Sequence, residues 1–220
     1  MATAALPATR YANIEELVRA LGDVPLDRIR ADPPPGTATK ADVLAAHARD
    51  KSLCELVDGT LVEKPMGYRE SRLASIGSYF IERYLETHNI GVTAGESGML
   101  ELEAGLVRIP DVSFVRWEQF PNREVTDVPI PDLYPDLAIE VLSPSNTKRE
   151  MKRKRKEYFA AGTRLVWELN PKTRTVDVYT APETFKRLDE SKTLDGGEVL
   201  PGFKLSIRRW FERAERGRTS

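Results

Sequence analysis

Two carboxylates interrupt two apolar stretches of this chain, and they constrain its fold more than any other feature. Asp111 comes directly before Val-Ser-Phe-Val at 112–115, and Glu140 lies inside Leu-Ala-Ile-Glu-Val-Leu at 137–142. The second stretch otherwise has the composition of a strand that is buried on both faces. An ionised carboxylate in such a setting is costly unless it is paired, hydrogen-bonded or bound to a metal, so two of them on neighbouring strands indicate a shared cation. The sequence therefore points towards metal-dependent chemistry.

The composition is that of a globular protein. Of the 220 residues, 40% are hydrophobic and 30% are charged, which is too mixed for wholesale disorder. No apolar run approaches the roughly 18 residues that a membrane span needs, and the N-terminus lacks a basic segment followed by an apolar one, so we expect a cytoplasmic protein with no membrane partner. The one cysteine, Cys54, excludes an intrachain disulfide and a cysteine-cluster metal site.

Proline and glycine divide the chain into two parts. Asp-Pro-Pro-Pro-Gly at 32–36 cannot continue a helix and reads as a linker. We therefore expect residues 1–36 to form a tail and an appendage helix, which Asn13 caps and Gly22 stops, and residues 37–220 to form the main domain.

Hydrophobic spacing predicts the elements of that domain. Helical periodicity is found at 40–49, 68–87, 147–161 and 207–215, and Asp58-Gly59 marks a hairpin over 53–63. Further strands are expected at 92–95, 99–103, 106–115, 139–142, 165–169 and 175–180, with a surface loop over 118–135 and a small hairpin over 184–199. The order of helices and strands predicts an α/β or α+β fold with a mixed central β-sheet flanked by helices.

Positive charge is concentrated in one segment. Residues 145–175 hold ten Lys or Arg against three Glu, a local charge of +7 in a chain whose net charge is −1. A solvated helix face is the commoner explanation of such a run. The alternative is a patch that holds a phosphate backbone beside an acidic metal site.

The helix predicted over 147–161 carries a lysine that could complete the site. Glu150, Lys154 and Tyr158 are spaced four residues apart and share a face, and the helix directly follows the strand of Glu140. Asp111 and Glu140 would bind Mg²⁺, with Mn²⁺ as an alternative, and Lys154 would position a water or stabilise developing charge. This combination is typical of a hydrolytic nuclease.

These residues also carry a family resemblance. Glu-Leu-Val-Asp-Gly at 55–59, Arg-Ile-Pro-Asp-Val-Ser-Phe-Val at 108–115, Ile-Glu-Val-Leu-Ser-Pro-Ser-Asn at 139–146 and Tyr-Phe-Ala-Ala-Gly-Thr-Arg-Leu-Val-Trp at 158–167 resemble the Uma-two family (DUF820). That family resembles a branch of the PD-(D/E)XK nuclease superfamily. The resemblance covers roughly residues 40–205 and implies a restriction endonuclease-like core.

The resemblance also implies roles for individual residues. Asp111 and Glu140 match the two acidic positions. Leu142 stands where the superfamily pattern has lysine, which implies that the lysine has moved to the next helix as Lys154. A shift in register there would substitute Lys152 or Lys156.

Two further glutamates match positions near the family's site. Glu70 stands where many relatives carry a histidine near the start of the first long helix, and it would act as a metal or water ligand or only favour the helix dipole. Glu55 would be a third metal ligand, with a hairpin carboxylate facing solvent as the alternative.

The sequence thus predicts a metal-dependent endonuclease that hydrolyses phosphodiester bonds of DNA, with a homodimer as a further expectation. One alternative is a nucleic-acid-binding or regulatory module that keeps the nuclease fold without efficient catalysis. Another is a purely structural pairing in which Lys154 neutralises Asp111 and Glu140. For Ile207, Trp210 and Phe211 in the last helix, two roles stay open: a subunit interface, or docking on the sheet.

Overall fold

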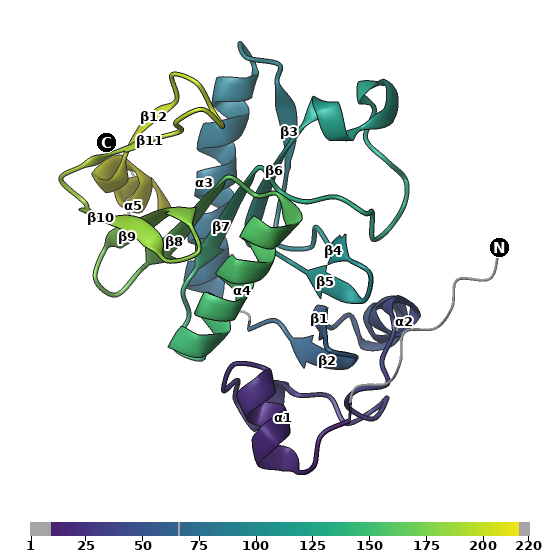
Figure 1. Cartoon of the computed structure of the whole chain (residues 1–220). Helices are drawn as coiled ribbons and strands as arrows, with labels where there is room; N and C mark the ends of the chain where they lie inside the picture. Colours follow the sequence, from purple (N-terminus) through teal and green to yellow (C-terminus); the bar gives the residue numbers. More distant parts are fainter. Residues whose placement is uncertain (1–9, 66, 216–220) are drawn as a thin grey trace.

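A six-stranded mixed sheet forms the centre of the protein in a computed structural model that describes residues 10–65 and 67–215 (Figure 1). Its strand order is β10-β9-β8-β7-β6-β3. Strands β7 and β8 run parallel, and the other neighbours are antiparallel. The strands span β3 Gly91–Ala94, β6 Val112–Arg116, β7 Leu137–Val141, β8 Leu165–Asn170, β9 Thr175–Ala181 and β10 Thr184–Asp189.

Two smaller antiparallel sheets accompany it. One has the order β2-β1-β5-β4, and the other pairs β11 with β12. Asp58 and Gly59, at the turn between β1 and β2, both have positive φ, which is the backbone that an Asp-Gly hairpin turn requires. These strands span β1 Cys54–Val57, β2 Thr60–Glu63, β4 Leu100–Glu103, β5 Leu106–Arg108, β11 Thr193–Asp195 and β12 Lys204–Ser206.

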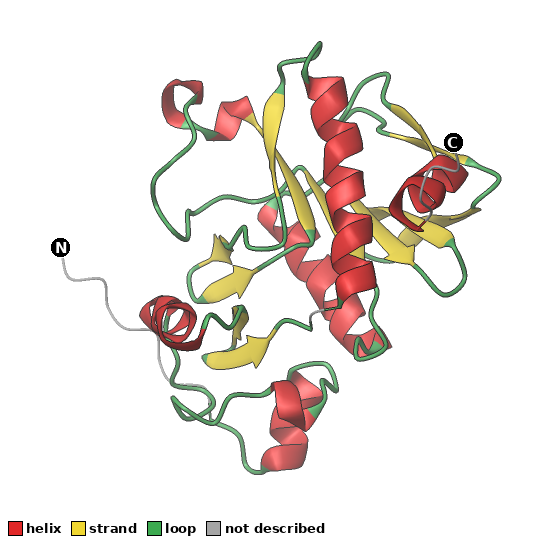
Figure 2. Ribbon diagram, turned by 180° about the vertical axis from the view of Figure 1, so that it is seen from behind, coloured by secondary structure: helices red, strands yellow, loops and turns green. Residues whose placement is uncertain are grey.

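Helices cover both faces of the large sheet (Figures 1 and 2). Helices α3 (Tyr68–Leu85) and α5 (Ile207–Glu215) pack on one face, where Leu137, Ile139 and Val141 of β7 point. Helix α4 (Lys148–Ala161) packs on the other, where Tyr158 contacts the cluster around Ala138. Because successive residues of a strand point to opposite faces, Glu140 faces α4. The remaining helices are α1 Ile14–Ala20, α2 Lys40–Asp50, and the short 3₁₀ turns Leu26–Arg28, Trp117–Gln119 and Pro121–Arg123.

Local chemistry fixes both ends of α4. Thr147 and Glu150 form a capping box at its start, in which the Thr147 side chain accepts from the Glu150 N–H. Gly162 ends the helix with φ +120°, and a Cβ there would lie 2.8 Å from the Tyr134 ring, so only glycine fits. The helix is thus held as the crossover between the parallel strands β7 and β8.

The end of the chain differs from its predicted arrangement. The predicted hairpin over 184–199 is wrong, because β10 joins β9 at the edge of the large sheet and β11 pairs with β12 instead. Ile207, Trp210 and Phe211 are fully buried within the chain, and Trp210 packs against Gly77 of α3. These three residues therefore pack in the core of the chain, as one of the two predicted roles requires, and they do not form a subunit interface.

The segment before residue 36 packs against the start of α4. Arg28 is buried and makes two hydrogen bonds to Glu150 at 2.7 and 3.0 Å. Thr147 and Arg153 donate to the backbone carbonyls of Gly22 and Ala20. The division of the chain at residue 36 stays a prediction.

The prediction of a mixed central sheet flanked by helices is confirmed. The helices expected at 40–49, 68–87, 147–161 and 207–215 and the hairpin around Asp58 and Gly59 are all present, with small differences at their ends. Within residues 10–65 and 67–215, no helix is long and apolar enough to cross a membrane.

Candidate active site

Asp111 lies immediately before β6, at the edge of the large sheet. Its backbone N–H donates to the carbonyl of Ile139 at 3.0 Å, and its Oδ2 accepts from the N–H of Val141 at 2.6 Å. Its Oδ1 lies 2.8 Å from Nζ of Lys64, which follows β2. Asp111 is thus held in place by β7 and by Lys64, and its carboxylate, which is 14% exposed, still reaches solvent.

Glu140 is buried between the sheet and α4. Tyr158 donates its hydroxyl to Oε1 at 2.6 Å, and Nζ of Lys154 lies 3.5 Å from the same oxygen. Burial raises the pKa of Glu140 to about 7, since the repulsion from Asp111 and Glu55 adds to it and outweighs the attraction of the lysines. The side chain is therefore a carboxyl group that titrates near neutrality.

Lys154 is the member of the basic run that points to the carboxylates. Its side chain is 2% exposed, and Nζ lies 2.9 Å from Oε1 of Glu55 as well as 3.5 Å from Glu140. Lys152 is half exposed and pairs with Glu183, and Lys156 is exposed. Burial alone would lower the pKa of Lys154, but Glu140 and Glu55 reverse this and raise it. Lys154, and not Lys152 or Lys156, is therefore the lysine of this helix that faces the carboxylates, as the sequence predicted.

Glu55 is buried in β1, so the alternative that it faces solvent is wrong. Its Oε1 accepts from the N–H of Ile109 at 3.2 Å and contacts Lys154, and its Oε2 lies 2.7 Å from Nη1 of Arg108. Burial opposes its charge, but Lys154 and Arg108 together lower the pKa of Glu55 to about 2. Glu55 is an ionised counter-ion to two buried cations, and its role as a metal ligand stays a prediction.

Glu70 lies apart from this cluster. It occupies the first turn of α3, where its carboxylate folds back over Gly67. No ion pair or hydrogen bond joins its side chain to Asp111 or Glu140 within the described part of the chain. Its position suits the favourable interaction with the helix dipole, and its catalytic role stays a prediction.

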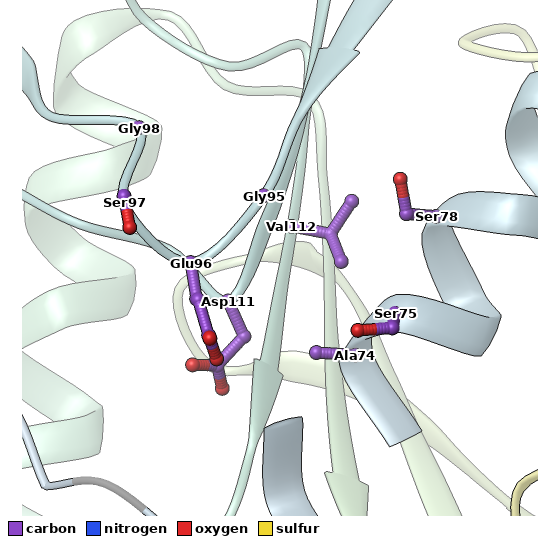
Figure 3. Close-up of a pocket in the computed structure, with 9 residues that line it drawn as sticks. All are labelled: Ala74, Ser75, Ser78, Gly95, Glu96, Ser97, Gly98, Asp111 and Val112. Carbon is purple, nitrogen blue, oxygen red and sulfur yellow. The ribbon is translucent and has the colours of Figure 1, made fainter. Parts of the chain in front are cut away.

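A polar cavity of about 430 Å³ opens beside Asp111 (Figure 3). Ser75 and Ser78 of α3 form one wall, and the loop of residues 95–98 between β3 and β4 forms another. Glu96 from that loop and Asp111 both line the cavity, and the Glu96 backbone carbonyl accepts from Lys64 at 3.3 Å. Asp111 is thus the candidate residue that lines this cavity, on the side of α3.

The sequence did not reveal Lys64, Arg108 or Glu96. Lys64 and Glu96 sit in short connecting segments without periodicity, so nothing in the local pattern shows that they meet Asp111. Arg108 did carry a signal, since it is a charged residue at the end of the apolar pair Leu106-Val107, next to Ile-Pro-Asp. A buried arginine needs an anionic partner, and here it has Glu55 and Glu157.

The donor set fits a hard divalent cation. Mg²⁺ keeps several waters and is commonly bound through one or two carboxylates, and Asp111 and Glu140 supply two on adjacent strands. Burial is the main cause of the raised pKa of Glu140, and the negative charges of Asp111 and Glu55 add to it. A cation would compensate these charges. Residues 10–65 and 67–215 contain no cluster of three or more His, Cys, Asp or Glu arranged for a metal. A metal at this site would therefore depend on the two carboxylates and water.

The basic run of the sequence is mostly neutralised within the protein. Seven of the ten Lys and Arg in 145–175 form ion pairs, four of them with buried or partly buried carboxylates of the sheets and of α4 itself. These seven are Arg149, Lys152, Arg153, Lys154, Arg155, Arg164 and Arg174. Most of the run is thus paired within the protein, and Lys148 and Lys156 stay exposed on α4 without an ion pair among the described residues.

Comparison with known proteins places this site in a family. A search of the curated proteins finds no match. One solved structure with the same fold is described as "Crystal structure of a putative nuclease belonging to DUF820 from Anabaena variabilis ATCC 29413", with a TM-score of 0.68 and 22% identity over 79% of this chain and 97% of that chain. The family model described as "Putative restriction endonuclease" matches residues 41–208, a span that includes Asp111, Glu140 and Lys154. The chain therefore belongs to the Uma2 family of restriction endonuclease-like proteins.

Proposed function

We propose that the protein is a metal-dependent endonuclease that hydrolyses phosphodiester bonds of DNA. The observation that supports this most is the convergence of Asp111, Glu140 and Lys154 from three parts of the chain, with Asp111 also lining the cavity beside α3. A structural ion pair alone does not need the second carboxylate to remain partly exposed, as Asp111 does.

Each residue has a definite task in this proposal. Asp111 and Glu140 would hold Mg²⁺ or Mn²⁺, which when bound polarises a phosphodiester and acidifies a water. Lys154 orients the attacking water or stabilises the charge that develops on the phosphate. Glu55 keeps Lys154 charged and in place, and Tyr158 orients Glu140 by its hydrogen bond.

The test compares two glutamates that are partners in register on β7 and β8. Glu140→Gln and Asp111→Asn should abolish Mg²⁺ binding in calorimetry and the cleavage of supercoiled plasmid. Glu168→Gln is the matched control, because Glu168 pairs with Glu140 across the strands and is equally buried, but is held by Arg155. Equal losses in all three variants would contradict the proposal.

Two other functions remain distinguishable in the same experiment. A nucleic-acid-binding or regulatory module would bind DNA without cleaving it at any Mg²⁺ or Mn²⁺ concentration. A purely structural cluster would show loss of stability in the variants and no metal affinity in the folded wild type. The homodimer and the cytoplasmic location are parts of the proposal that size measurement and localisation of a tagged protein would test.

A further inference from the structure

A second concentration of positive charge lies on the outer surface of α3 and α5, away from the basic run of α4. Five arginines there are exposed, and none lies within 4 Å of a carboxylate among the described residues. They are Arg72, Arg83, Arg208, Arg209 and Arg213. We call these five residues the arginine surface. It contrasts with α4, where most cations are already paired.

Aromatic rings order three of these guanidinium groups. The Cζ of Arg213 lies 4.3 Å from the centroid of the Tyr79 ring, and that of Arg209 lies 5.3 Å from the centroid of Phe80. Arg83 donates to the Tyr79 hydroxyl at 3.4 Å. A guanidinium stacked on a ring keeps its N–H edges free for an anion and loses less freedom when it binds one. The surface is therefore partly preorganised for anionic groups.

The carboxylates of the same helices do not cancel this charge. Glu82 accepts from Thr93, and Glu215 is bound by Arg69 and Arg174. Glu82 keeps its charge, because Thr93 is neutral, and Glu86 and Glu212 are the other exposed acidic residues near these arginines. Three carboxylates still leave the five arginines in excess. The hydrogen bond from Arg83, together with the charges of Arg213 and Arg209, lowers the pKa of Tyr79, which agrees with a positive local field.

The arginine surface shares helix α3 with the cavity beside Asp111. Ser75 and Ser78 line the cavity of Asp111, and Arg72 and Tyr79 follow the neighbouring stripe of the same helix. Figure 2 shows α3 between the strands β3 and β4 on one side and α5 on the other, with α4 behind the sheet. A chain of phosphates that crosses α3 would therefore meet both the arginines and the cavity.

We propose that the arginine surface is the docking surface for the phosphate backbone of a nucleic acid, which approaches Asp111 across α3 and not across α4. The identification of the partner as a nucleic acid rests on the proposed nuclease function. Regularly spaced phosphates suit a row of exposed guanidinium groups, and such contacts make binding depend on salt because each neutralised phosphate releases counterions.

The experiment measures DNA binding without catalysis. The full chain is titrated into a fluorescein-labelled duplex of about 30 base pairs in EDTA, and anisotropy is followed between about 50 and 200 mM salt. Arg83→Gln/Arg209→Gln is compared with Lys148→Gln/Lys156→Gln, because the latter removes two exposed lysines of α4 that form no ion pair in the described residues. Both double variants change the net charge equally, and Arg83→Lys/Arg209→Lys keeps the charge. Thermal unfolding verifies that each variant is folded.

We expect the arginine-to-glutamine variant to bind about tenfold or more weakly and to reduce the slope of log affinity against log salt by about one to two. The lysine-to-glutamine control should bind like the wild type, and the arginine-to-lysine variant should keep the wild-type salt slope. Equal losses in the two glutamine variants, a loss confined to the α4 control, or equal competition by polyglutamate would overturn the inference. Metal binding and cleavage are measured separately, so a negative result in this DNA-binding experiment does not contradict the proposed function. Loss of cleavage by Asp111→Asn, in turn, does not contradict the role of the arginine surface.

Discussion

Nζ of Lys154 lies 2.9 Å from Oε1 of Glu55, and both side chains are at most 2% exposed. This contact joins helix α4 to strand β1 of the four-stranded sheet. Arg108 binds the other oxygen of Glu55, so one carboxylate is shared by two buried cations, whose second partners are Glu157 and Glu140. The arrangement fixes where the lysine can point, because moving it would leave charges unpaired in an apolar interior.

Replacement of Glu55 should therefore be costly. Glu55→Gln keeps the shape of the side chain but leaves Lys154 and Arg108 without their shared counter-ion, and we expect a loss of about 3–5 kcal/mol in the free energy of unfolding. Glu63→Gln on the neighbouring strand β2 removes a half-exposed ion pair with Arg30 and should cost less than about 1 kcal/mol. Urea denaturation of both variants tests this, and equal stabilities would contradict it.

Metal affinity should depend on pH through Glu140. The pKa of this group is raised to about 7, so in the metal-free protein it carries a proton below that pH, and a cation must displace the proton to bind. We expect Mg²⁺ affinity in calorimetry to rise about tenfold per pH unit below pH 7 and to level off above it. Affinity that is constant between about pH 6 and 8 would refute this assignment.

The raised pKa of Glu140 also makes the stability of the folded protein depend on pH. The native state holds a proton on Glu140 that the unfolded chain releases near the ordinary glutamate pKa of 4.5, so this group's contribution to stability falls as the pH rises from there to about 7. Tyr158→Phe removes a hydrogen bond that favours the ionised carboxylate. That variant should shift the midpoint of the metal-affinity profile to higher pH.

Lys64 should compete with the metal for Asp111. Its ammonium lies 2.8 Å from Oδ1, close to where a second cation would bind, so Lys64→Met should strengthen Mg²⁺ binding by about tenfold, or ~1.4 kcal/mol. Lys40→Met is a suitable control, because that lysine pairs with Glu101 instead. Calorimetry in the absence of substrate separates binding from catalysis, and weaker binding by Lys64→Met would show that this lysine supports the metal site.

The buried pair of Arg28 and Glu150 predicts that the first 36 residues contribute to stability. Burial raises the pKa of Glu150, but the hydrogen bonds and charge of Arg28 have a larger effect and lower it. The pair therefore stabilises the native state at neutral pH. That contribution is lost as the pH falls from the ordinary glutamate pKa of 4.5 through the lower pKa of the folded state. Arg28→Met should cost about 3–5 kcal/mol at neutral pH. Arg19→Met, which breaks an exposed pair within α1, should cost less than about 0.5 kcal/mol in the same denaturation experiment.

The sequence by itself determined most of the helices and strands and the chemical types at the site. Short-range patterns suffice for this, because the Asp-Gly turn, the Gly162 stop and the four-residue spacing from Glu150 to Lys154 and Tyr158 all act through neighbouring residues. Carboxylates inside apolar strands revealed Asp111 and Glu140 because such residues need partners.

Only the tertiary structure decided which charges meet. The sequence left open whether Glu55 is a metal ligand or faces solvent, and it is a buried counter-ion because β1 packs beside β5 and beneath α4, which no local pattern encodes. Lys64 reaches Asp111 from a connecting segment, and the cations of α4 are paired by residues as distant as Asp23 and Asp58. Ion pairs depend on distances between elements that are remote in sequence. The sequence therefore shows which residues are charged, but only the packing decides which of them are paired and which stay unpaired.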